Sequence, residues 1–406
     1  MNIYQQFGVE PIINLWGTAT GFGGSLMAPE TVDAIVEASK YCVRIDELQG
    51  AASTFIAKAT GAEAGYVTCG AHSGMLLSTA ACIAGLDLVK MERLPDSRAM
   101  PNEVLMAKDQ RSGWDHAIRA AGGVIVDVGF NEAFIGSLRN VDLWEYEAAI
   151  TERTVAIAYV AYTLDEKKAK KIAQLAELAH KHNIYLIVDA AASVPPIANL
   201  RSVIEQGADL VAFSGGKALR GPQNTGILCG RQNLIASVAL QHLDMTGHSE
   251  FWNPPASIIP PGLVPGQPRQ GLGRGMKVSK EVLVGLLARL RALTLEKTLE
   301  EAAHMEGILL RLVEGFKDLK GVSCALSNRA ADGSGAAPSL QLTLNPKIIG
   351  ADGFEISRRL RDGRPRLMVN EKQLSDNILL ITAVSLPPEL VDNVIERMRA
   401  VFQGAK

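Results

Sequence analysis

The sequence has few aromatic residues, no excess of either charge and no long apolar run. Aromatic side chains make up 5% of its 406 residues, which argues against an aromatic-rich β-sandwich. Lys and Arg number 41 and Asp and Glu 43, so the sequence lacks the basic surplus typical of nucleic-acid-binding proteins. No run reaches the roughly eighteen apolar residues of a membrane-spanning helix. We therefore expect no nucleic-acid partner and no membrane insertion.

Cysteine is also scarce and is not patterned. The five cysteines are odd in number and none are spaced CxxC, which excludes a disulfide framework and a zinc ribbon. We predict no metal site. The first residues, MNIYQQFGVEPIINLWG, lack a charged-then-apolar signal region, so a cytoplasmic location is expected.

What the sequence does contain is a regular alternation of short apolar runs and amphipathic stretches. With 47% apolar residues, the chain suits one large enzyme subunit of two unequal domains. Strands separated by helices of ten to fifteen residues predict an α/β fold with a mostly parallel central sheet. The predicted strands are 65–68, 104–107, 123–128, 155–159, 184–188, 209–213 and 226–229.

The pattern changes after residue 253. Six prolines between residues 254 and 268 predict a loop, and a long helix follows over 277–317, interrupted at most near Thr294. The last ninety or so residues predict a small α+β domain with strands 321–326, 339–344, 366–369 and 378–384. We divide the chain into an N-terminal arm and helix (1–50), a large cofactor domain (51–275), a linking helix (276–317) and a small C-terminal domain (318–406).

A lysine follows the apolar run 209–213. Ser214-Gly-Gly-Lys217 comes directly after this run, at the edge where a parallel sheet delivers functional side chains. A lysine lifted from bulk water among glycines favours the neutral amine that a Schiff base requires. A surface loop lysine is the alternative that this segment alone leaves open.

An aspartate and a glycine turn complete the pattern. Asp189 closes the run 184–188, so it is either a helix N-cap or a functional acid. A strand-end carboxylate and a lysine one strand later are what pyridoxal phosphate needs, since the carboxylate keeps the ring nitrogen protonated while the lysine holds the aldehyde. The helix that begins around Gly70 after strand 65–68 offers an anion site for the phosphate, although many helices begin after a glycine.

Together these elements resemble the fold-type-I pyridoxal phosphate enzymes. The resemblance is strongest to the selenocysteine synthase-like (L-seryl-tRNA selenium transferase-like) group, in the metabolic branch typified by D-glucosaminate-6-phosphate ammonia lyase. It covers nearly the whole chain. The matching segments are Ile13-Asn14 with Gly17-Thr18, residues 60–64, 68–71, 94–96, 188–191, 214–217 with 221–223, and 273–278.

The resemblance implies roles for individual residues. Lys217 would form the Schiff base and move the α-proton, and Asp189 would pair with the pyridine nitrogen. Arg274 and Lys277 would face the phosphate or an anionic substrate. The other predicted cofactor contacts are Gly70, Ala71, His72, Ser214 and Thr225, and the other predicted substrate contacts are Thr18, Gln223, Arg364 and Arg366.

Two features of the predicted site stay open or depart from the group. Either Trp114 or His116 would stack on the cofactor ring, and the sequence does not decide between them. At position 216 this chain has glycine, whereas the corresponding segment of the selenium-transferring members resembles Ser-Gly-Asp-Lys. This difference and the balanced net charge argue against tRNA-linked chemistry.

The predicted function is a pyridoxal phosphate-dependent lyase. It would remove ammonia from a hydroxylated amino acid or amino sugar acid resembling D-glucosaminate 6-phosphate and leave a keto acid. A racemase, an aldolase and a β-substituting enzyme are alternatives with the same cofactor, and a sugar-phosphate-binding protein is the alternative without catalysis. The resemblance also implies a homodimer or a larger homo-oligomer.

Overall fold

A computed structural model describes residues 2–130, 141–162, 164–327 and 336–404. The chain divides into two compact units. The first contains residues 1–27, 195–197 and 292–406, and the second contains residues 28–194 and 198–291. The N-terminal arm thus groups with the C-terminal part of the chain, a long-range association for which the sequence carries no local signal.

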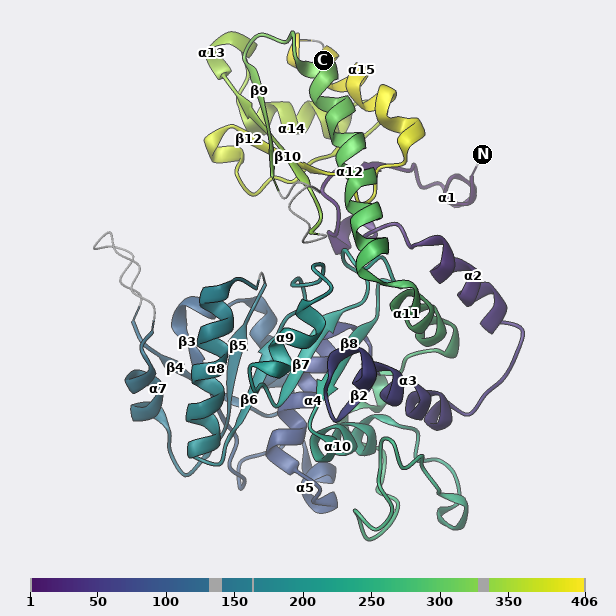
Figure 1. The fold of residues 1–406 in the computed structure, drawn as a ribbon, viewed down its shortest axis with the longest axis vertical. Helices are drawn as coiled ribbons and strands as arrows, with labels where there is room; N and C mark the ends of the chain where they lie inside the picture. Colours follow the sequence, from purple (N-terminus) through teal and green to yellow (C-terminus); the bar gives the residue numbers. More distant parts are fainter. Residues whose placement is uncertain (1, 131–140, 163, 328–335, 405–406) are drawn as a thin grey trace. The chain divides into compact units, whose positions relative to one another are not determined.

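The second unit is built on a seven-stranded sheet with the order β2-β8-β7-β6-β5-β3-β4 (Figure 1). Strands β4, β3, β5, β6 and β7 are parallel to their neighbours, and β8 runs antiparallel to both β7 and β2. This confirms the mostly parallel α/β sheet. The strands are β2 (Ala64–Thr68), β3 (Glu103–Ala107), β4 (Val124–Val128), β5 (Thr154–Val160), β6 (Tyr185–Asp189), β7 (Leu210–Ser214) and β8 (Gly226–Gly230).

Helices cover both faces of this sheet, with α4 on one face and α8 on the other (Figure 1). Helix α4 is almost entirely buried, because small residues such as Ala80 and Ala81 let it lie close to the central strands. The helices are α2 (Pro29–Ala38), α3 (Ile45–Thr60), α4 (Gly70–Ala84), α5 (Leu88–Arg93), α6 (His116–Ala120), α7 (Leu143–Ala149), α8 (Glu166–Lys181), α9 (Asn199–Glu205), α10 (Gln232–His242) and α11 (Lys280–Ala292).

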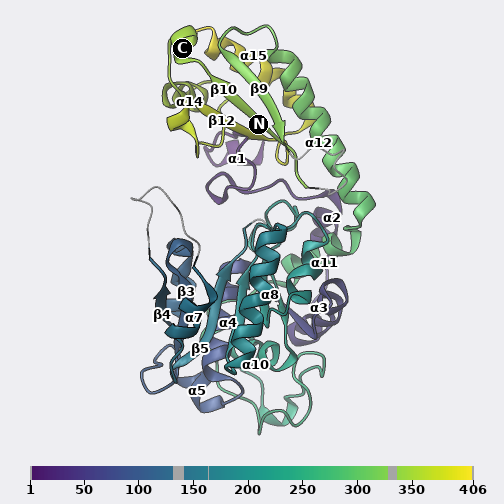
Figure 2. The ribbon, with the colours of Figure 1, turned by 60° about the vertical axis from the view of Figure 1, so that its left-hand side comes forward.

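The first unit contains a three-stranded antiparallel sheet in the order β12-β10-β9 (Figure 2). Leu340, Leu342 and Leu344 alternate with less buried residues and form a core with helices α12, α14 and α15, as expected for a sheet with one covered face. The elements are α1 (Ile3–Gln6), β1 (Ile13–Asn14), α12 (Leu295–Phe316), β9 (Val322–Ser327), β10 (Ser339–Leu344), α13 (Pro346–Ile349), α14 (Gly353–Asp362), β11 (Leu367–Met368), β12 (Ile378–Thr382) and α15 (Val391–Phe402).

Two details refine the predicted elements. The long helix predicted over 277–317 is interrupted where expected: Thr294 caps α12 by accepting the Lys297 N–H at 3.1 Å. The strand predicted at 366–369 does not join the three-stranded sheet. Instead, β11 pairs in parallel with β1 from the N-terminal arm.

Candidate active site

The carboxyl ends of β6 and β7 bring Asp189 and the segment of Lys217 to one edge of the sheet. These strands are parallel neighbours, and Asp189 lies opposite Ala212 in β7. Two residues of β7 follow Ala212, and the chain then enters the turn that carries Lys217. The adjacent strand ends explain how two residues far apart in sequence come within electrostatic range of each other.

The N-terminus of α4 lies at the same edge. Thr68 at the end of β2 and Ser214 at the end of β7 both pair with Gly226 of β8. Gly70 opens α4 with a φ of +79°, and a β-carbon added to Gly226 would lie 2.5 Å from the Gly70 carbonyl carbon. Cys69, the N-cap, makes no side-chain capping bond. The first amide groups and the helix dipole thus lie beside the lysine loop, where the predicted phosphate contacts of Gly70, Ala71 and His72 stay a prediction.

The turn that carries Lys217 is closed by its own backbone. The Gly215 N–H donates to Thr225 O at 2.8 Å, and the Gly221 N–H donates to Gly215 O at 2.9 Å. Gly216 lies directly against the backbone of Gln223, so a side chain at position 216 would collide with it. The glycine that distinguishes this loop from Ser-Gly-Asp-Lys is therefore required by packing.

Asp189 is a buried carboxylate at the end of β6. Its carboxylate accepts the Ala191 N–H at 3.0 Å, and it forms no ion pair among the described residues. Burial raises the pKa of Asp189, and the Ala191 N–H and the charges of Lys217 and His72 act in the opposite direction. A buried acceptor of this kind suits a protonated ring nitrogen, so the residues present fit pyridoxal phosphate.

His72 lies within electrostatic range of Asp189, and Trp114 and His116 lie near His72. The His72 and Trp114 rings lie 6.2 Å apart, edge to face. Partial burial lowers the pKa of His72; the charge of nearby His116 lowers it further, and Asp189 raises it. Trp114 is 62% exposed. The structure thus brings both predicted stacking candidates to this edge, and the choice between them stays a prediction.

Tyr162 is a residue of this site that the sequence reasoning missed. It follows β5, where the Ala161 N–H donates to Asp189 O at 2.8 Å. Burial raises the pKa of its phenol, a hydrogen bond with Ser112 opposes this shift, and the charge of Asp189 adds to it. The signal was available, because Tyr162 stands just beyond a predicted strand end on the same edge as Asp189 and Lys217.

Other predicted contacts take several positions. Ser214 ends β7, and Ala71 is buried in the first turn of α4. Thr225 is buried and its hydroxyl donates to Pro222 O at 2.7 Å. The backbone of Gln223 packs directly against Gly216. These residues border the lysine loop, and their predicted cofactor and substrate contacts remain predictions.

A short 3-10 helix, Leu272–Met276, packs on α10 and α4. Arg274 lies within this helix, and Lys277 follows its last residue. Arg274 forms an ion pair with Asp244 at 2.6 Å, and Lys277 is exposed. Their role towards an anion stays a prediction.

The remaining predicted substrate residues belong to the first unit. Thr18 is half-buried in the N-terminal arm. Arg364 is largely exposed and lies 3.8 Å from Glu10, and the Arg366 Nε donates to Arg361 O at 3.3 Å. The substrate roles of Thr18, Arg364 and Arg366 stay predictions.

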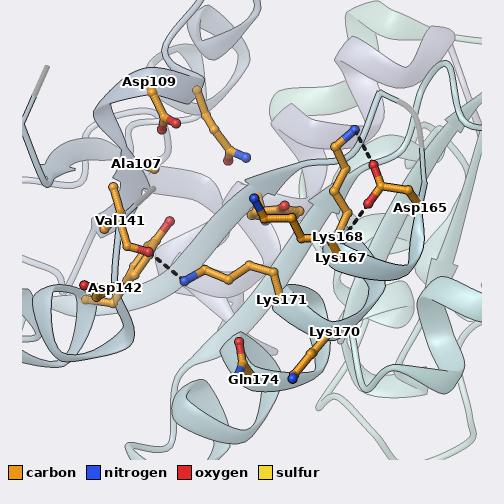
Figure 3. Close-up of a pocket in the computed structure, with 13 residues that line it drawn as sticks. Ala107, Asp109, Val141, Asp142, Asp165, Lys167, Lys168, Lys170, Lys171 and Gln174 are labelled. Atoms are coloured by element: carbon orange, nitrogen blue, oxygen red, sulfur yellow. Dashed lines mark hydrogen bonds and ion pairs between the residues drawn. The ribbon is translucent and has the colours of Figure 1, made fainter. Parts of the chain in front are cut away.

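A separate cavity of about 530 Å³ lies between α8 and the ends of β3 and β5 (Figure 3). Lys171 donates to Val141 O at 2.7 Å, and Lys168 pairs with Asp165 at 3.4 Å. The described residues that line it include none of the predicted site residues. Across the described part of the chain, no cluster of His, Cys, Asp and Glu could hold a metal, and no helix is long and apolar enough to cross a membrane.

Comparison with known proteins supports the fold and the class of enzyme. Residues 114–251 match the aminotransferase class-V family model. D-glucosaminate-6-phosphate ammonia lyase of Salmonella typhimurium is 29% identical over 100% of this chain and 99% of its own length. A solved structure of D-glucosaminate-6-phosphate ammonia-lyase has a TM-score of 0.77 and 27% identity, covering 100% of this chain and 99% of that one. The 5'-C-glycyluridine monooxygenase-decarboxylase of a Streptomyces species is 28% identical over 98% of this chain and 92% of its own length.

The fold, the strand-end aspartate and the lysine loop define a pyridoxal phosphate-dependent enzyme of fold type I. Within that class the chain resembles the selenocysteine synthase-like group, as the sequence motifs predicted, and its full-length likeness to D-glucosaminate-6-phosphate ammonia lyase places the resemblance in the metabolic branch.

Proposed function

We propose that this enzyme is a lyase that removes ammonia from a hydroxylated amino acid or amino sugar acid and releases a keto acid. The observation that carries the proposal is the full-length likeness, in sequence and in structure, to D-glucosaminate-6-phosphate ammonia lyase. A substrate of that type carries an amine for the cofactor and an anionic end for basic side chains.

The chain's own residues account for the chemistry as follows. Pyridoxal phosphate, when bound, draws electron density from the substrate's α-carbon. Asp189 would hold the ring nitrogen in its protonated form, and the free amide groups at Gly70, Ala71 and His72 would bind the phosphate. The Lys217 amine would take the proton from the α-carbon. Arg274 and Lys277 would bind the substrate's anionic end. The enzyme would act as a homodimer or a larger homo-oligomer.

The decisive assay uses purified enzyme supplied with pyridoxal phosphate. Incubation with D-glucosaminate 6-phosphate should release ammonia and a keto acid in equal amounts. The unphosphorylated acid should react with a higher KM, because it lacks the anion that Arg274 and Lys277 are proposed to bind. Failure to release ammonia from either compound would reject this substrate class.

A second candidate function comes from the Streptomyces relative, whose identity to this chain is nearly the same. An oxygen-dependent decarboxylation of an amino acid group would use the same lysine and aspartate with molecular oxygen as co-substrate. Measuring oxygen uptake and carbon dioxide release, with and without air, separates the two. Ammonia release that is equal under nitrogen and in air favours the lyase.

A further inference from the structure

A buried arginine bonds the backbone of the lysine loop. Arg289 on α11 is 1% exposed and is the largest fully buried side chain among the described residues. Its Nε donates to the Leu219 carbonyl at 2.6 Å, and its Nη1 forms an ion pair with Glu30 on α2 at 2.7 Å. Leu219 stands just beyond Lys217 in the same turn. The guanidinium therefore acts on the loop itself rather than on a neighbouring strand.

The backbone that Arg289 holds has an unfavourable conformation. Arg220, the residue after Leu219, has a φ of +58°, a left-handed conformation that residues with side chains rarely adopt. Its N–H donates to Lys217 O at 2.9 Å, and its carbonyl accepts the Ala28 N–H, just before α2, at 2.9 Å. Such a turn persists only when surrounding contacts fix it, and Arg289 supplies one of them.

Helix α11 also packs on the glycines of the turn. The Leu286 side chain lies so close to Gly215 and Gly221 that a β-carbon on either would contact its δ-methyl group. One face of α11 thus presents Leu286 and Arg289 to the loop, while α2 presents Glu30 to Arg289. The loop is bracketed by two helices that contribute no predicted cofactor contact.

The ion pair is better explained by geometry than by stability. Removing a guanidinium and a carboxylate from water carries a desolvation cost that their attraction offsets only in part, and apolar residues of equal volume often serve stability as well. A planar guanidinium, by contrast, fixes two acceptors in one plane, here the Leu219 carbonyl and the Glu30 carboxylate.

We propose that Arg289 is a positioning residue: together with Glu30 it fixes the Leu219 carbonyl and so sets the direction in which the turn presents Lys217. The role of Lys217 rests on the proposed function; the holding of the loop does not.

The first test needs no cofactor. Hydrogen exchange of the cofactor-free protein is compared between wild type and Arg289→Lys in the peptide spanning residues 215–222. Loss of the Nε hydrogen bond should speed exchange there about ten- to a hundredfold, the equilibrium effect of a hydrogen bond to a charged group. Arg231→Lys, which alters an ion pair with buried Asp209 away from the loop, is the matched control and should leave this peptide unchanged.

A second variant covers the case in which Arg289→Lys does not fold. Glu30→Gln keeps the size and the acceptor oxygen but removes the charge that orients the guanidinium, so exchange in the same peptide should rise several-fold. Unchanged exchange in whichever of the two variants folds would overturn the proposal. So would acceleration spread equally over the whole protein, which indicates general destabilisation.

In the cofactor-loaded enzyme, misplacement of Lys217 should lower kcat at least tenfold with little change in KM, and should shift the pH at which the absorbance of the bound cofactor changes. Arg231→Lys should do neither. If wild-type protein takes up no cofactor, the proposed function fails while the exchange experiment still decides the role of Arg289.

Discussion

Two buried aspartates on neighbouring strands differ in what surrounds them. Asp209 precedes β7 at the amino edge of the sheet and is 1% exposed. Arg231 and His180 pair with its carboxylate, the latter at 3.1 Å, and the Leu186 N–H donates to it at 2.7 Å. Asp189 ends β6 at the opposite edge, is 9% exposed and accepts the Ala191 N–H.

The difference separates a structural carboxylate from one that we predict to be functional. Arg231, His180 and the Leu186 amide satisfy Asp209, so its charge is compensated within the fold. Asp189 lacks a direct ion pair among the described residues, and burial raises its pKa. The fold thus maintains a buried carboxylate that would suit the protonated ring nitrogen of the cofactor, as we predict for Asp189.

The largest expected effect comes from removing the lysine that shares the edge with Asp189. Lys217→Ala should abolish borohydride-stable attachment of pyridoxal phosphate and lower turnover on the order of a thousandfold or more, since it removes the proton-transfer group. Mass spectrometry after borohydride treatment measures the attachment. Undiminished attachment in this variant would mean that another lysine holds the cofactor.

Asp189→Asn tests the functional side of the comparison. It should lower kcat about a hundred- to a thousandfold, because the electrostatic partner of the ring nitrogen is lost, while the cofactor-free protein folds at least as stably as wild type. Steady-state kinetics and thermal unfolding of the same sample measure both. A destabilised variant with full activity would reverse the assignment of the two aspartates.

Asp209→Asn tests the structural side. Leaving Arg231 without its carboxylate should reduce the free energy of unfolding by about 2–3 kcal/mol. This loss is smaller than for a fully buried ion pair, because the Arg231 side chain is 44% exposed and solvent screens its charge. The kcat per folded molecule should not change. Denaturant unfolding with activity normalised to active-site content provides the measurement.

The smallest effect concerns pH. The folded-state pKa of Asp189 lies above its unfolded value, so between the two the folded protein binds more protons. Its contribution to the stability of the cofactor-free protein is therefore present below the unfolded pKa and is lost as pH rises through the folded pKa. The loss is measured as the difference between the unfolding free energies of wild type and Asp189→Asn at each pH. It should amount to about 1.4 kcal/mol for each unit by which folding raises the pKa of Asp189. A flat difference would contradict the raised pKa.

Much of the fold and part of the site could be read from the sequence. The strand-end positions of Asp189 and Lys217 and the glycine turn at Gly70 follow from local patterns, because apolar runs and turn residues mark strand ends directly. Tyr162 was missed, although the same strand-end reasoning applies to it. The contact of Arg289 with the lysine loop could not be predicted, since it joins residues 70 positions apart through a side chain that looks like an ordinary helix arginine.

By itself, the sequence determined the class of fold and predicted the lysine and the aspartate of the site, because parallel α/β sheets place the residues after their strands at one edge. Only the tertiary structure decided which buried charges are compensated. The pairing of Asp209 with Arg231 and the hydrogen bond from Arg289 to Leu219 depend on distances between elements remote in sequence. So does the lack of an ion pair between Asp189 and any other described residue. Desolvation and hydrogen bonding act through those distances, and no local pattern encodes them.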